Sequence, residues 1–190
     1  IKIAYQGRPG AYSHLACKEA FPKSVPIACE TFEEVFEKTH IGETNISLIP
    51  VENSQAGRVA DIHNLLPRTK LVITGEFFFK INHQLLGVKE TNLQNIKYAV
   101  SHFHALAQCR EFLQANKIKP ILGTDTAGAA EILSKKENKE TAAIASSLAA
   151  EIYNLKILKK DIQDAHHNTT RFFIMKDKIA EKRIDNTKYI

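Results

Sequence analysis

Cysteine is scarce in this 190-residue sequence, and no uninterrupted apolar run is long. The three cysteines, Cys17, Cys29 and Cys109, are odd in number and widely spaced, which argues against a disulfide framework and favours a reducing compartment. No apolar run approaches the length that spans a bilayer. The sequence opens on the strand-like run Ile1–Tyr5, so we expect no signal peptide. These absences predict a cytoplasmic protein with no membrane partner.

Positive charge is present but is not concentrated. The formal net charge is +5, with only mild clusters such as Lys135–Lys136 and Lys159–Lys160. No basic stripe interleaves with aromatic residues, so we expect a solvated surface and no nucleic-acid partner. A mildly basic protein also suits an anionic small-molecule substrate.

The eight histidines lack the spacing of metal ligands. His102 and His104 are two positions apart and His166 and His167 are adjacent, whereas helical zinc sites use positions i and i+4. We therefore predict no metal site, and we expect His14, His102 and His104 to be structural.

The sequence does contain a regular alternation of strand-like and helix-like segments, with 44% hydrophobic residues. The alternation runs from residue 1 to about 75 and resumes from about 96 to 160. Two long strand-like runs, Leu71–Phe79 and Ile81–Val88, interrupt it. This rhythm predicts an α/β fold with mainly parallel sheets in two lobes joined by crossing strands.

The predicted lobes have approximate boundaries. Lobe 1 contains about residues 1–78 and 168–176, and lobe 2 contains about 79–167. A cleft between lobes is the natural ligand site, and several strand ends could line it.

Local signals predict several helices. Thr31 with Glu34 is a capping pattern, and that helix ends near Ile41–Gly42. We also expect helices over Arg58–Leu66, Phe103–Asn116 and Ser146–Tyr153, and one capped by Asp125 or Thr124.

The stretch Asn168–Met175 organises the rest of the sequence. An apolar strand signal, Phe172–Met175, is entered through Thr169, Thr170 and Arg171. A hydroxyl beside a permanent cation offers a proton donor next to a group that can hold a carboxylate. The alternative is that Thr170 and Arg171 only open an edge strand.

Two other strand ends carry polar groups. The turn Gly7–Gly10 separates a strand from a helix over 11–21, which suits an anion at the helix start, or else it is only a tight structural turn. Glu52, Asn53 and Ser54 follow the apolar run Ile46–Val51, where open α/β sheets bind ligands. Their alternative is a polar loop capping the next helix.

Six short segments, taken in order, give the sequence a family resemblance. They are Gly7–His14, Pro50–Ser54 with Gly57, Ser101–His102 with Ala107–Cys109, Asp125–Ala127 with Ala129–Ala130, Ala142–Ala145, and Asn168–Phe172. With them the chain resembles prephenate dehydratase over about residues 1–176, and the triplet Thr170–Phe172 is the family hallmark. The resemblance implies decarboxylating dehydration of prephenate to phenylpyruvate, water and carbon dioxide in phenylalanine biosynthesis.

The resemblance also implies an architecture. It indicates an α/β, two-lobed periplasmic-binding-protein-like (type II) fold with a cleft between the lobes, and a catalytic domain over 1–176. Residues 177–190 resemble a linker and the start of a truncated regulatory ACT domain. The family forms dimers and tetramers, so a homodimer or homotetramer is expected, and the reaction needs neither a metal nor an organic cofactor.

The site residues are carried over position by position. The implied catalytic residues are Thr170, Asn53, Gln108, Ser101 and Glu52. The implied binding positions for the dianionic substrate are Gly10, Ala11, Tyr12, Ser13, Ser54, Arg171, Phe172, Thr126 and Ala127. Thr170 is expected to give a hydrogen bond or proton to the departing hydroxyl within a network that includes Asn53, Ser101 or Gln108.

Several alternatives stay open at this stage. The sequence departs from the family at Phe103-His104 and Arg8-Pro9, which puts substrate contacts in doubt. Arg171 either orients a carboxylate or supports the backbone. The rival functions are arogenate dehydratase and a non-catalytic two-lobed small-molecule-binding module.

Overall fold

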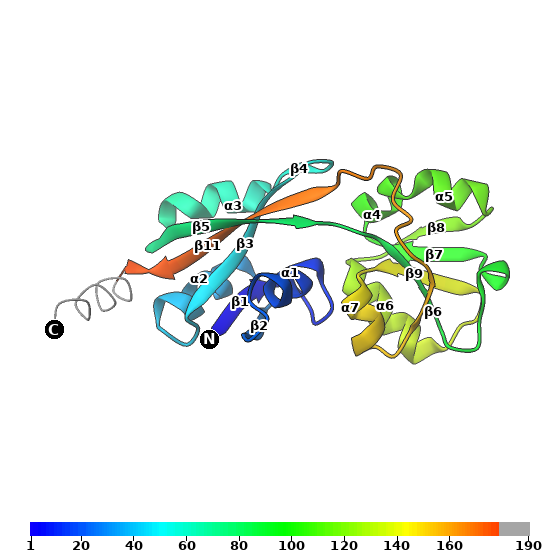
Figure 1. Cartoon of the computed structure of the whole chain (residues 1–190), viewed down its shortest axis with the longest axis horizontal. Helices are drawn as coiled ribbons and strands as arrows, with labels where there is room; N and C mark the ends of the chain where they lie inside the picture. The colour runs from blue at the N-terminus through cyan, green and yellow to red at the C-terminus, as the bar shows by residue number, and fades with distance from the viewer. Residues whose placement is uncertain (179–190) are drawn as a thin grey trace. The chain divides into compact units, whose positions relative to one another are not determined.

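A computed structural model describes residues 1–178 of the chain, which form two compact units. Of the described residues, unit 1 contains Ile1–Gly7, Ala16–Phe79 and 169–178, and unit 2 contains Arg8–Leu15 and Lys80–Asn168. Each unit is built on one mixed β-sheet with helices packed against it, which confirms the predicted two-lobed α/β fold class (Figure 1). Most of the predicted linker and regulatory start, 179–190, lies outside the described residues.

The sheet of unit 1 has the strand order β2-β1-β3-β11-β5, with β4 paired to β3. The strands are β1 (Lys2–Gln6), β2 (Val25–Cys29), β3 (Ile46–Asn53), β4 (Gly57–Arg58), β5 (Leu71–Lys80) and β11 (Thr169–Asp177). Strand β1 is parallel to β2 and β3, whereas β11 is antiparallel to β3. The prediction of mainly parallel sheets is therefore wrong, because the chain returns to this unit beside β3 in the opposite direction.

The pairing of β11 with β3 is interrupted by a bulge. Arg171 lies opposite Glu52 but Phe172 lies opposite Pro50, so Val51 is the additional residue. Pro50 has no N–H to donate to a ladder, and a bulge accommodates such a residue inside a sheet.

The helices of unit 1 pack on this sheet, and one of them is capped by Thr31 as predicted, although the Glu34 carboxylate accepts the N–H of Glu30 and not that of Thr31. They are α2 (Phe32–His40), α3 (Ala60–Leu65), the 3₁₀ turn η1 (Leu66–Arg68) and the end of α1 (Tyr12–Ala20). The Glu34 N–H donates to Thr31 Oγ1 at 3.2 Å, and Gly42 follows α2 with a φ of +79°. Arg58, predicted to be helical, instead pairs with Glu52 in β4, so α3 begins two residues later.

The sheet of unit 2 has the order β10-β6-β9-β7-β8. Its elements are β6 (Gln84–Gly87), η2 (Leu93–Asn95), β7 (Tyr98–Ser101), α4 (Phe103–Gln108), α5 (Arg110–Ala115), β8 (Lys119–Leu122), α6 (Thr126–Lys136), β9 (Thr141–Ala145), α7 (Ser147–Ile152) and β10 (Lys156–Lys159). Strand β7 is parallel to β8 and β9, and β6 is antiparallel to β9 and β10. Small residues of β9 and α6 allow the helix to lie close to the sheet, as the cluster of buried alanines shows.

Two predicted elements of unit 2 are shorter than the sequence indicates. The helix expected over Phe103–Asn116 is broken at the buried Cys109, whose N–H donates to Leu106 three residues back, so α4 ends at Gln108. The second long strand is only Gln84–Gly87, because Ile81 N–H is used by the carbonyl of Asn168 and His83 by the side chain of Gln163.

The segment Arg8–Leu15 belongs by its contacts to unit 2, although the sequence places it in lobe 1. Ser146 Oγ donates to Gly10 O at 2.6 Å, and Tyr153 Oη donates to Pro9 O at 2.8 Å. The Arg8 guanidinium lies 3.0 Å from the Glu131 carboxylate. These bonds hold the start of α1 against α6 and α7.

Strand β11 extends two residues beyond the predicted end at Met175. Asp177, expected to begin a linker, is 7% exposed and is the last residue of the strand. Its Oδ2 lies 2.5 Å from His40 Nδ1, which ties the strand end to α2.

None of the helices within residues 1–178 combines the length and apolar character that crossing a bilayer requires.

Gly10 is a position where substitution should be costly, and Gly42 is its matched control. Both have positive φ, so alanine costs each about 1–2 kcal/mol of backbone strain. Only at Gly10 would the new Cβ meet the backbone, 2.9 Å from Ala149 Cα. We expect Gly10→Ala to lower the free energy of unfolding by about 1–3 kcal/mol more than Gly42→Ala. Urea unfolding of both variants measures this, and equal losses would contradict the close packing of Gly10 on α7.

Candidate functional site

The predicted hydroxyl of Thr170 meets the side chain of Asn53 in unit 1. The two residues face each other across the β11–β3 ladder. Asn53 Nδ2 donates to Thr170 Oγ1 at 2.8 Å, and Thr170 is 8% exposed. The sequence prediction that these residues form one network is therefore matched by a direct hydrogen bond.

The orientation of Asn53 determines what the Thr170 hydroxyl can do. The Asn53 Oδ1 atom accepts the backbone N–H groups of Gln55 at 2.9 Å and Ala56 at 2.8 Å. Since a backbone N–H can only donate, the oxygen of the carboxamide must face the turn and its nitrogen must face Thr170. The threonine oxygen therefore accepts from Asn53, and its own proton remains available to a second acceptor.

Ser54 reinforces the same strand end. It is exposed, and its N–H donates to Thr169 O at 2.9 Å. The Thr169 N–H donates in return to Ser54 Oγ at 3.0 Å. This reciprocal pair joins the turn after β3 to the start of β11.

Arg171 is held by two carboxylates of the sheet. Its Nη1 lies 3.1 Å from Glu52 Oε1, and its Nε and Nη2 bind the two oxygens of Glu76 at 3.2 and 2.5 Å. The guanidinium carbon also lies 5.2 Å from the centre of the Phe173 ring. The hydrogen bonds of Glu76 and Glu52 raise the pKa of Arg171, and the Arg171 bond lowers the pKa of Glu76.

This geometry favours the second of the two roles left open for Arg171, support of the local structure. The fork is occupied by carboxylates of β3 and β5, so Glu52 is also a partner of Arg171. Sequence reasoning did not single out Glu76, and the available signal was a carboxylate inside the otherwise apolar β5 run. Phe172, predicted to bind substrate, is 1% exposed, so its ring packs within the core.

In unit 2 the predicted residue Gln108 receives two hydrogen bonds on one atom. Asn168 Nδ2 donates to Gln108 Oε1 at 2.8 Å, and His83 Nε2 lies 2.7 Å from the same oxygen. The other ring nitrogen of His83, Nδ1, lies 2.6 Å from Tyr12 Oη. Burial raises the pKa of Tyr12, so its phenol keeps its proton, and burial lowers the pKa of His83.

His83 was not singled out by the sequence analysis. Its signal was the interruption of an apolar run by Asn82, His83 and Gln84. The structure leaves this segment irregular between β5 and β6, with the His83 side chain only 3% exposed.

The helix start predicted to hold an anion is partly occupied by internal bonds. The Gly10 N–H donates to His14 Nδ1 at 3.1 Å, and the Ala11 N–H donates to Arg8 O at 3.0 Å. Ser13 lies half-buried on the first turn of α1. An anion here would have to use the N–H groups that follow Ala11.

Three further predicted residues lie where they serve the fold of unit 2. Ser101 is fully buried and its Oγ donates to Ile144 O at 2.6 Å, which joins β7 to β9. This placement argues against a catalytic role, because the hydroxyl proton is used inside the sheet. Ala127 is fully buried in α6, while Thr126 is half-buried on its first turn after the capping residue Asp125.

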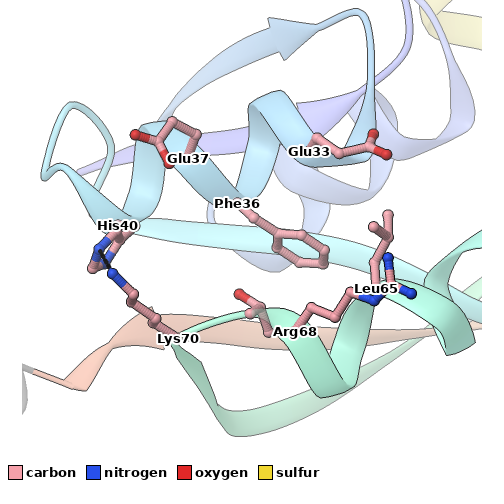
Figure 2. A pocket seen from close by; sticks show the side chains of 8 residues that line it. Glu33, Phe36, Glu37, His40, Leu65, Arg68 and Lys70 are labelled. Carbon is pink, nitrogen blue, oxygen red and sulfur yellow. Dashed lines mark hydrogen bonds between the residues drawn. The ribbon is translucent and has the colours of Figure 1, made fainter.

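A pocket of about 260 Å³ on unit 1 contains none of the predicted site residues. Figure 2 shows Glu33 and Glu37 of α2 on one side and Arg68 and Lys70 on the other, with Phe36 between them. Lys70 Nζ lies 3.4 Å from His40 Nε2.

Within residues 1–178, no group of three or more His, Cys, Asp or Glu side chains is arranged to hold a metal ion.

The lowered pKa of His83 predicts a pH dependence of stability. The unfolded chain binds this proton below a pKa of about 6.5, whereas the folded chain resists it, so stability rises with pH through this window. The contribution is complete above pH 6.5 and is lost as the pH falls toward the folded-state value. We expect the free energy of unfolding of His83→Phe to change less between pH 7.5 and 5.5 than that of the parent chain. Parallel curves from chemical denaturation would show that the folded and unfolded states bind this proton equally.

Comparison with known proteins shows which family the chain resembles. A family model described as prephenate dehydratase matches residues 3–180. A bifunctional N-acyl-homoserine lactone acylase/prephenate dehydratase of Komagataeibacter europaeus is 45% identical over 172 residues, 90% of this chain and 61% of that protein. The chloroplastic arogenate dehydratase/prephenate dehydratase 1 of Arabidopsis thaliana is 40% identical and covers 92% of this chain, which spans 45% of that protein.

A solved structure of similar fold extends the likeness to three dimensions. The prephenate dehydratase of Arthrobacter aurescens in complex with L-Phe gives a TM-score of 0.85 at 26% identity, covering 93% of this chain and 60% of that one. The present chain thus spans less than two thirds of each of these proteins. The family model covers nearly all of the described residues, and the chain belongs to the prephenate dehydratase family.

Proposed function

We propose that the chain catalyses the decarboxylating dehydration of prephenate to phenylpyruvate. The observation that carries the proposal is the hydrogen bond from Asn53 Nδ2 to Thr170 Oγ1, which leaves the threonine proton free to be donated. Membership of the prephenate dehydratase family supports the same reaction class.

The reaction requires one proton at one place. The bond between the ring and its carboxylate breaks, and its electron pair enters the ring as carbon dioxide leaves. The bond between the opposite ring carbon and its hydroxyl breaks with the electron pair on oxygen, which takes up a proton and leaves as water. Because the ring becomes aromatic, the main catalytic task is to help the hydroxyl depart and to orient the dianion.

Thr170 would supply a hydrogen bond or proton to the departing oxygen. A threonine hydroxyl is a weak acid, but the Asn53 N–H on its oxygen stabilises negative charge that develops there as the proton moves. A positioned proton donor typically contributes about 10²–10⁴-fold to the rate.

The carboxylates of the substrate need donors that are not already used within the protein. The amide Nε2–H of Gln108 is a candidate donor, because the hydrogen bonds of that side chain converge on its oxygen. Arg171 would act indirectly, by holding Glu52 and the first part of β11 in place. Glu52 itself would not touch a dianion, since like charges repel.

The nearer alternative is the same reaction on arogenate, which carries an ammonium where prephenate carries a keto group. The Arabidopsis relative is named for both activities. A second candidate class is hydrolysis of an N-acyl-homoserine lactone amide, because the K. europaeus relative is named as bifunctional. We also propose a cytoplasmic location and assembly as a homodimer or homotetramer.

The test follows phenylpyruvate after prephenate is added to the purified chain, with arogenate and an N-acyl-homoserine lactone in parallel. We expect phenylpyruvate from prephenate at a higher kcat/KM than phenylalanine from arogenate. Release of homoserine lactone without either aromatic product would overturn the dehydratase assignment.

Thr170→Ala should lower kcat by about 10²–10⁴-fold, because the proton donor is lost while a small side chain is tolerated. Thr170→Ser is the matched control, since it keeps the hydroxyl and the bond from Asn53. We expect it to retain most of the activity, with thermal unfolding of both variants close to that of the parent chain. Near-normal turnover in Thr170→Ala would remove Thr170 from the mechanism.

A further inference from the structure

Four side chains of unit 2, two buried and two half-buried, form a continuous line of hydrogen bonds. Tyr12 Oη lies 2.6 Å from His83 Nδ1, and His83 Nε2 lies 2.7 Å from Gln108 Oε1. Asn168 Nδ2 completes the line at 2.8 Å from the same Gln108 oxygen. His83 is 3% exposed and Asn168 is 1% exposed, so water does not compete for these bonds.

The chemistry of each group gives the line one direction. Asn168 donates to Gln108 Oε1, which therefore is the carbonyl oxygen and an acceptor. Only a protonated Nε2 of His83 can bond to that oxygen. A neutral imidazole carries a single N–H, so Nδ1 is then the bare nitrogen and accepts the phenol proton of Tyr12.

The surroundings of His83 favour this neutral form. Burial lowers the pKa of its imidazole, and the bond to Gln108 offsets only part of this effect. The phenol of Tyr12, which bonds to His83 Nδ1, stays protonated because burial raises its pKa. The thiol of Cys109, which interacts with Tyr12, also stays neutral because burial raises its pKa.

The result is a carboxamide with only one end left for a ligand. Gln108 Oε1 has both lone pairs engaged, one by His83 and one by Asn168. The Gln108 side chain is half-buried at the last position of α4, so its amide Nε2–H is the part that can donate outward. Rotation of the amide by 180° would place two donors, or two acceptors, against each other.

We propose that His83, itself oriented by Tyr12, is a positioning residue. It fixes the Gln108 carboxamide so that the Gln108 Nε2–H donates to an oxygen of the substrate. This inference rests on the proposed function and deepens it. Tyr12, predicted to bind substrate directly, would then act through His83, because its hydroxyl proton is already used.

The first test is spectroscopic and does not require activity. Two-bond ¹H–¹⁵N correlation spectra of the histidine rings distinguish the Nε2–H from the Nδ1–H tautomer. We expect His83 of the purified chain to be the neutral Nε2–H tautomer at pH 7.5. The Nδ1–H tautomer, or a protonated ring, would overturn the proposal, because the Gln108 oxygen would then face outward or the line would lose its direction.

Tyr12→Phe and Tyr153→Phe are matched variants for this measurement. Each removes one tyrosine hydroxyl in unit 2. That of Tyr12 bonds to His83 and also lies 3.4 Å from Asn82 O, whereas that of Tyr153 donates to Pro9 O and has no part in the line. We expect Tyr12→Phe to shift the His83 ring nitrogen signals or mix the tautomers, and Tyr153→Phe to leave them unchanged. Equal spectra for both variants would show that Tyr12 does not set the tautomer.

The second test is a double-mutant cycle on kcat/KM. His83→Phe keeps the ring volume and removes the donor, so we expect a loss of about tenfold, corresponding to one hydrogen bond of about 1.4 kcal/mol. In the Gln108→Ala background the same change should cost almost nothing, because its only route of action is gone. His83→Gln, which keeps an N–H close to the Nε2 position, should recover part of the activity.

The outcomes separate the two proposals. A His83→Phe loss of equal size in both backgrounds would mean that His83 acts on stability or on another group, and would overturn the positioning role. A parent chain that forms no aromatic product from prephenate or arogenate would overturn the proposed function, while the tautomer measurement would still decide the orientation of Gln108.

Discussion

The pairing of β11 with β3 is the constraint on which the chemistry of unit 1 depends. It joins segments more than a hundred residues apart in the sequence, and it places Thr170 opposite Asn53 and Arg171 opposite Glu52. Because successive side chains of a strand point to opposite faces, a shift by one residue would reverse every one of these relationships. The Arg171 bonds to Glu52 and Glu76 are partly exposed ion pairs, so their main contribution is to this register and not to overall stability.

A common device recurs in the two units. In Asn53 the carboxamide oxygen accepts two backbone N–H groups, and in Gln108 it accepts two side-chain N–H groups. Saturating the oxygen determines which way the nitrogen of the amide faces. Each unit thus holds a carboxamide N–H in a fixed direction through its own contacts, and in unit 1 that N–H donates to Thr170.

Features that depend on residues close together in the sequence could be predicted from it, whereas those that depend on contacts between distant segments could not. The Thr31 and Asp125 caps were predictable because each involves residues three positions apart. Thr170 and Asn53 were singled out at strand ends and again by the family resemblance, and the structure places them in contact. The break of the helix at Cys109, the partner Glu76 and the line through His83 depend on packing between distant segments, which local patterns do not record.

The bulge at Val51 divides the β3–β11 ladder into two stretches with different alignment. On one side lie the buried and mainly apolar pairs, Phe172 with Pro50 through Met175 with Ser47, and on the other lie the polar pairs of Thr170 and Arg171. The additional residue separates the two stretches, so that adjustments in the core stretch need not be transmitted to the Thr170 hydroxyl. Substitutions in the interior of this unit can therefore occur with little disturbance of the polar end of the strand.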